Sequence, residues 1–119
     1  MSDRMVVLMN HDDEISVMAA LVMGGAIAAT GSQPLIFVQP GAAKVMVKGA
    51  LDKYQGLKGQ PDPVFLFESI NVLEGRFILC ELGLPIFDIT KEDLYDEVEV
   101  MNASSFIWEV EDAKLVFSY

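Results

Sequence analysis

The chain has 119 residues, which is enough for one domain with a buried core and too few for two. Hydrophobic residues make up 52% of it, which excludes a disordered chain and indicates strands buried on both faces, an apolar subunit interface, or both. The formal net charge of −10 argues against nucleic acid and membrane surfaces as partners, because both are anionic.

The negative charge is concentrated in the second half of the chain. Residues 1–60 hold five acids and five bases, whereas residues 61–119 hold thirteen acids and three bases, so a basic protein partner remains open. The single cysteine cannot form an internal disulfide, and one histidine gives no zinc-type ligand set. We therefore expect a cytoplasmic protein with no metal. We also expect no cofactor, because Gly24-Gly25 lacks the GxGxxG spacing of a dinucleotide-binding site.

The first third of the chain predicts a strand, a helix and a second strand. Arg4–Asn10 is a short apolar run typical of a buried parallel strand. Asp12 or Asp13 caps a helix that runs to Thr30, and this apolar helix is too short to span a membrane because the pattern breaks at Gly31. The helix carries a stripe of small residues, Ala20, Gly24 and Ala28, and the second strand is Pro34–Gln39.

The middle of the chain predicts two helices joined by a loop. Gly41–Tyr54 has the pattern of a helix with its lysines in water, and Gln55–Pro63 contains two glycines and two prolines, typical of a mobile loop. Asp62 and Pro63 begin a helix that reaches Glu74, although Val64–Phe67 is also compatible with a strand.

The last third alternates strands and helices again. Right-handed crossovers between buried strands make the sheet mostly parallel. The sequence therefore predicts one α/β domain over residues 1–119. Its expected architecture is a three-layer, open, five-stranded Rossmann-like sheet with helices on both faces. The expected elements are a strand at Arg76–Glu81, a loop with a short acidic turn at Leu82–Asp96, a strand at Val98–Met101, a helix at Asn102–Asp112 and a strand at Lys114–Tyr119.

The candidate site lies where the strands end, because open parallel sheets bind ligands beyond the carboxyl ends of their strands. The candidate reactive residue is Cys80, at the end of the third strand. The residues expected around it, from the ends of the first four strands, are Asn10, His11, Asp12, Gln39, Glu81 and Asn102.

Each of these residues also has a purely structural interpretation. Free cysteine is among the most buried residue types, so Cys80 could be inert packing, and His11 could be an ordinary solvated loop residue. Asp12 could serve only to cap the helix, and Glu81 should point to the opposite face of the strand from Cys80.

Arg76–Val100, RFILCELGLPIFDITKEDLYDEVEV, combines a strand that ends in cysteine, a small loop, a short acidic turn and a second strand, VEV. This stretch resembles the DsrE/DsrF-like sulfur-relay family, and Asn102–Tyr119 is similar to the closing helix and strand of that family. The resemblance implies a Rossmann-like sheet, homo-oligomers that are often trimers or hexamers, and a cysteine, here Cys80, that carries sulfur as a persulfide. This chain departs from the pattern in placing Glu81 beside the thiol, with no lysine or arginine nearby.

Three hypotheses follow for the function. The first is a sulfur carrier, similar to a sulfurtransferase, that exchanges sulfur between donor and acceptor proteins through Cys80. The second is a non-catalytic small-ligand-binding or assembly module of the same fold, and the third is a redox-sensing thiol. Composition predicts a homo-oligomer, with either the helix that carries Ala20, Gly24 and Ala28 or the Phe65–Phe67 segment in the interface.

Overall fold

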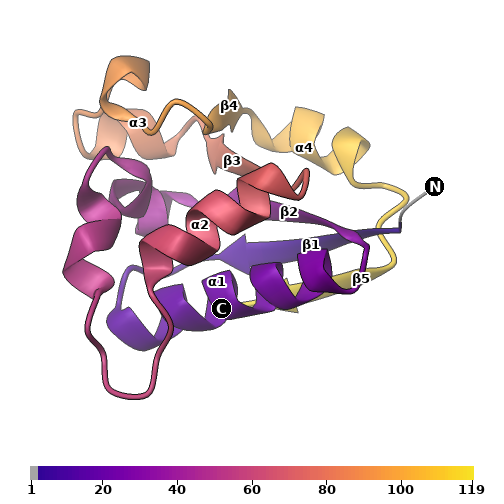
Figure 1. Ribbon diagram of the computed structural model, residues 1–119. Helices are drawn as coiled ribbons and strands as arrows, with labels where there is room; N and C mark the ends of the chain where they lie inside the picture. Colours follow the sequence, from indigo (N-terminus) through magenta and orange to yellow (C-terminus); the bar gives the residue numbers. More distant parts are fainter. Residues whose placement is uncertain (1–2) are drawn as a thin grey trace.

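A computed structural model describes residues 3–119, which fold around one five-stranded, all-parallel sheet with the strand order β4-β3-β2-β1-β5 (Figure 1). The prediction of an open α/β fold is confirmed, and the sheet is entirely rather than mostly parallel. The strands are β1 (Arg4–Met9), β2 (Gln33–Val38), β3 (Arg76–Cys80), β4 (Glu99–Met101) and β5 (Leu115–Ser118).

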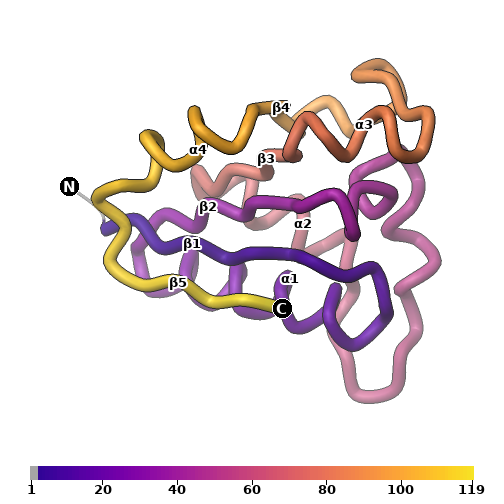
Figure 2. Tube along the Cα trace, turned by 180° about the vertical axis from the view of Figure 1, so that it is seen from behind, coloured from indigo at the N-terminus to yellow at the C-terminus, as the bar shows by residue number. Residues whose placement is uncertain are grey.

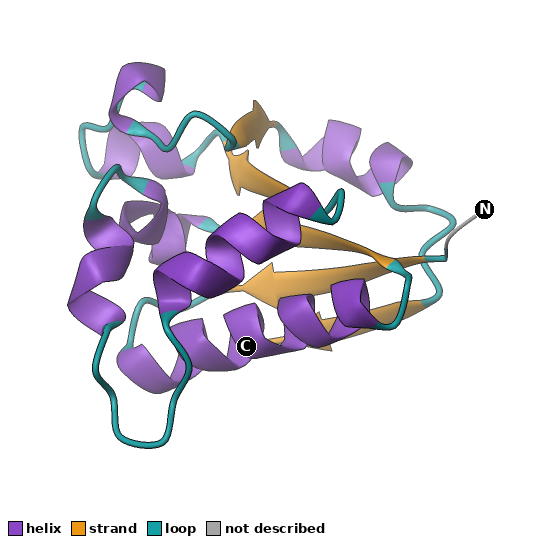
Figure 3. Ribbon diagram, in the orientation of Figure 1, coloured by secondary structure: helices purple, strands orange, loops and turns teal. Residues whose placement is uncertain are grey.

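Helices cover both faces of this sheet, as Figure 3 shows, but they cover them unequally. One face carries the long helix α1 (Glu14–Ala29), α2 (Pro63–Val72) and two 3-10 helices, η1 (Pro40–Met46) and η2 (Ala50–Tyr54). The other face carries α4 (Ala103–Glu109). The connection from β3 to β4 contains α3 (Gly83–Ile86) and η3 (Lys91–Asp93), which lies within the predicted acidic turn.

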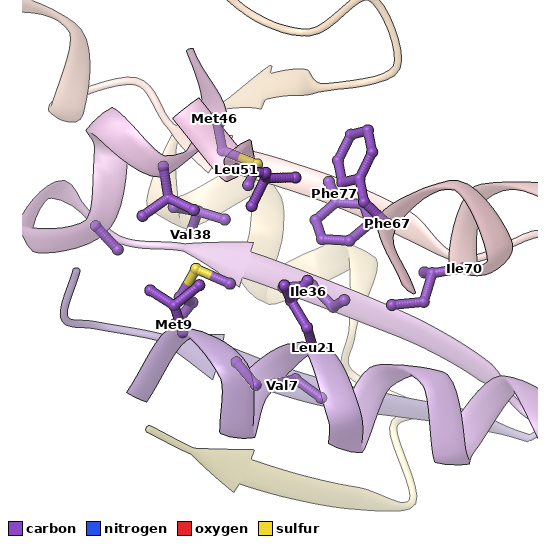
Figure 4. Close-up of a cluster of buried hydrophobic side chains, with 14 of the residues drawn as sticks. Val7, Met9, Leu21, Ile36, Val38, Met46, Leu51, Phe67, Ile70 and Phe77 are labelled. Atoms are coloured by element: carbon purple, nitrogen blue, oxygen red, sulfur yellow. The ribbon is translucent and has the colours of Figure 1, made fainter. Parts of the chain in front are cut away.

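The larger core lies under α1 and α2, where the alternate residues of each strand point (Figure 4). The small residues of α1 let that helix lie close to both the sheet and α2, since a Cβ on Gly24 would lie 2.8 Å from Ile36 Cδ1 of β2 and 3.1 Å from Ile70 Cδ1 of α2. Ala20, Gly24 and Ala28 are buried within the chain, so this stripe is the face of α1 that packs inside the molecule.

The predicted helix over Gly41–Tyr54 is also wrong. The segment forms η1 and η2 instead, because the backbone is extended at Val47, which bridges to Leu94, and left-handed at Gly49. The helix predicted to reach Glu74 ends at Val72, and the alternative strand at Val64–Phe67 does not form.

The smaller core lies between the sheet and α4. Figure 2 views the molecule from this side, with α4 near β3 and β2 and with β1 and β5 uncovered by it. The buried members of this core are Val6, Leu35, Phe37, Ile78, Cys80 and Phe106. The uncovered part includes Val116, which is 61% exposed.

Candidate functional site

Three of the predicted site residues form one row across the α4 side of the sheet. Val38 pairs with Met9 on one side and with Leu79 on the other. One residue further along these parallel strands, Gln39 therefore lies between Asn10 and Cys80. All three reach the carboxyl edge of the sheet, as the sequence predicted.

Hydrogen bonds orient the two amides of this row. Gln39 Nε2 donates to Asn10 Oδ1 at 2.8 Å, and Asn10 Nδ2 donates to Ser118 Oγ at 2.8 Å. The side chains thus link the ends of β2, β1 and β5. Ser118 was missed by the sequence analysis, because it is 108 residues from Asn10 and only the pairing of β5 with β1 brings it there.

Cys80 occupies the third place in the row, but it is only 5% exposed. Its neighbour in register on β4 is Met101, and it belongs to the buried cluster that contains Phe37, Ile78 and Phe106. The position at the end of β3 is confirmed, and the side chain there is buried. A reagent can reach this sulfur only if its surroundings move.

His11, Asp12 and Glu81 are exposed and do not join this row. His11 follows β1, and β2 lies between β1 and β3, so two strand spacings of together about 10 Å separate its strand from that of Cys80. Glu81 is held through its backbone, whose N–H donates to the Met101 carbonyl at 3.1 Å.

Asp12 serves the structure through its backbone, because its carbonyl accepts a hydrogen bond of 2.7 Å from the Tyr54 hydroxyl. Burial of that hydroxyl, with the negative charges of Asp12, Asp13 and Glu14 nearby, raises the pKa of Tyr54 to about 12. Asp13 rather than Asp12 caps α1, and the hydrogen bonds from Ser16 lower the pKa of the Asp13 carboxyl.

Asn102 lies after β4, at the predicted edge, where it caps α4. Its Oδ1 accepts a hydrogen bond of 2.8 Å from the backbone N–H of Ser105. The side chain therefore fixes the start of the helix that covers Cys80.

The other end of α4 is held by ion pairs at the amino edge of the sheet. Arg4 donates to the backbone oxygen of Glu109 at 2.7 Å and to its Oε1 at 2.9 Å, and Arg76 donates to the same carboxylate oxygen. Arg76 also makes two bonds to Glu99, at 2.8 and 2.7 Å. The arginines lower the pKa of the Glu109 carboxyl, and the two carboxylates raise the pKa of Arg76.

Within residues 3–119 no group of three or more His, Cys, Asp or Glu side chains could hold a metal ion. No helix in this part of the chain is long and apolar enough to cross a membrane.

Comparisons with known proteins identify the fold and nothing more specific. No family model and no curated protein matches the chain. Among solved structures, the ychN protein of E. coli is similar over all of both chains, with a TM-score of 0.77 and 16% identity. MTH1491 of Methanobacterium thermoautotrophicum, a protein of unknown function, is similar over 99% of this chain and 100% of its own, also with a TM-score of 0.77 and 16% identity.

Proposed function

We propose that the protein is a cytoplasmic sulfur carrier that holds sulfane sulfur as a persulfide on Cys80. The observation that carries the proposal is the position of this thiol at the carboxyl edge of an open parallel sheet, next to Gln39 in the row that continues to Asn10. Ligands of such sheets bind at that edge. The resemblance of Arg76–Val100 to the DsrE/DsrF-like family supports the same chemistry.

The transfer is a thiol exchange in two steps that need no external oxidant. The Cys80 thiolate attacks the outer sulfur of a donor persulfide, a new Sγ–S bond forms, the donor's S–S bond breaks, and the donor leaves as a thiolate. An acceptor thiolate then attacks the outer sulfur on Cys80, which returns as a thiolate. The chain supplies the nucleophile, and the amides of Gln39 and Asn10 lie in the same row.

A persulfide adduct is the direct test. The protein is incubated with a small-molecule persulfide donor and analysed as an intact mass and as peptides without reduction. We expect an added mass of about 32 Da, one sulfur atom, on the peptide that contains Cys80 and none in Cys80→Ser. A native protein that gains no such mass, although its unfolded form does, would contradict the proposal.

The burial of Cys80 favours a second candidate, a non-catalytic ligand-binding or assembly module. In that case the hydrogen-bonded side chains of Asn10, Gln39 and Ser118 bind a small polar molecule or are simply structural. A thiol that stays unmodified by persulfide donors, combined with a native mass that corresponds to an oligomer, would select this candidate.

We also propose that the protein is a homo-oligomer, with a trimer or hexamer favoured. The support is an apolar content of 52% in a short chain, together with large apolar side chains that remain exposed on α1, α2 and α4. Of the predicted interface residues, Phe65 is 64% exposed, whereas Phe67 is buried against Phe77 and Tyr95. Light scattering that gives the mass of a monomer would contradict this proposal.

A further inference from the structure

We propose that α4 is a lid over Cys80 and that Glu109 is the positioning residue that holds it shut. The purpose of such a lid rests on the proposed function, because a carrier must expose its thiol to large partners. Its opening is a property of the chain that can be measured whether or not Cys80 carries sulfur.

The lid depends on few contacts. Of the helices in residues 3–119, only α4 lies on the Cys80 face, and its seven residues are too few to form a stable helix alone. One buried side chain, Phe106, anchors it to the sheet by stacking on Phe37. The side chains that follow, Ile107 and Trp108, are exposed.

Glu109 supplies the second anchor, at the last turn. Its carboxylate accepts hydrogen bonds from Arg4 and Arg76, which extend from β1 and β3. All three side chains are half-buried, so their charges are less screened than those of a fully exposed pair. Loss of the carboxylate charge would leave Arg4 paired with Asp112 and Arg76 paired with Glu99, with no ion pair from either arginine to α4, and would weaken the closed position.

The position of the lid allows a local opening. Cys80 and Phe106 belong to the smaller core, whereas the larger core lies on the opposite face of the sheet under α1 and α2. Movement of α4 away from the sheet therefore exposes the thiol while the larger core stays intact. Such a local opening has a smaller free energy than global unfolding.

The test is the rate at which iodoacetamide alkylates Cys80 in the native protein. We expect Glu109→Gln to raise this rate about tenfold, which corresponds to a loss of about 1.4 kcal/mol when the hydrogen bonds from Arg4 and Arg76 lose their charged acceptor. Glu111→Gln removes the same charge from an exposed position two residues away and should change the rate less than about twofold.

Two further measurements separate a lid from general destabilisation. In hydrogen exchange, Glu109→Gln should raise the exchange rates of the amide protons of α4 and leave those of β1 and β2 unchanged. Low urea concentrations should hardly change the alkylation rate, because a local opening exposes little surface. If alkylation instead occurs only through global unfolding, or if both glutamate variants behave alike, the lid is wrong.

The wild-type protein gives an independent measurement in case Glu109→Gln does not fold. Rising NaCl screens the ion pairs and should increase the alkylation rate, and an unchanged rate would contradict the role of Glu109.

Failure of the carrier proposal can be told apart from failure of the lid proposal. An accessible Cys80 that never accepts sulfur refutes the carrier alone, whereas an alkylation rate that is insensitive to Glu109 and to salt refutes the lid alone.

Discussion

The ring of Phe106 stacks on the ring of Phe37 with centroids 3.9 Å apart and planes inclined by 11°. Both rings are buried, so this pair joins α4 to the middle of the sheet. This stack is the main apolar contact between α4 and the smaller core.

Replacement of Phe106 should lower the stability of the fold. Phe106→Ala removes a buried aromatic ring and leaves a cavity, so we expect the free energy of unfolding to fall by about 3 kcal/mol. Ile107→Ala changes an exposed residue of the same helix and should lower it by less than about 0.5 kcal/mol. Urea denaturation followed by circular dichroism measures both, and equal losses would show that α4 is not anchored by Phe106.

The ion pairs of Glu109 predict a dependence of stability on pH. Because its pKa is lower in the folded chain than the ordinary value of 4.5, the stabilising contribution is fully present above that value and is lost as pH falls through the folded pKa. The stability difference between wild type and Glu109→Gln should therefore be constant near neutral pH and shrink in acid. The stability difference between wild type and Glu111→Gln provides the control. If this difference changed with pH in the same way for both variants, the prediction would be contradicted.

The raised pKa of Tyr54 predicts that stability and tyrosinate absorbance change at high pH. With a pKa of about 12 in the folded chain, its hydroxyl keeps its proton where an ordinary tyrosine, near 10, has lost it. Its contribution to stability is present below pH 10 and is lost as pH rises toward 12. Absorbance at about 295 nm should show a late tyrosinate phase that is absent from Tyr54→Phe. A native titration curve without that phase would exclude the buried hydroxyl.

Gly41 predicts a steric effect at the candidate site. A Cβ at this position would collide with the backbone oxygen of Asn10, and a backbone atom cannot move aside as a side chain does. We expect Gly41→Ala to destabilise the fold by about 2 kcal/mol through overpacking. Gly31 has open space around it and a φ of +89°, so Gly31→Ala should cost only the backbone strain of about 1 kcal/mol. Thermal or urea unfolding of the two variants compares them, and a smaller loss at Gly41 would contradict the close approach.

Most elements could be predicted because their signals are local. The apolar run of β1 and a helix cap at Asp12 or Asp13 each depend on neighbouring residues, and the structure confirms the strand and selects Asp13 as the cap. The break between η1 and η2 could not be predicted in the same way. It depends on the bridge from Val47 to Leu94, which is a contact between distant parts of the chain.

The candidate site could be predicted only in part for the same reason. The end of each strand is visible in the sequence, so Asn10, Gln39 and Cys80 were found. Their order depends on β2 lying between β1 and β3, which no local pattern contains. That order also separates the strand of His11 from that of Cys80, and the burial of the thiol follows from the packing of α4.

The two edges of the sheet restrict how copies of this protein can associate. β4 has three residues and includes Glu99, and β5 has four residues and follows Lys114. Edges this short, with charges in or next to them, give a second sheet little backbone to pair with. Growth into continuous intermolecular sheets, as in amyloid, is therefore disfavoured, which leaves the outer surfaces of the helices and the uncovered face of β1 and β5 for an ordered assembly.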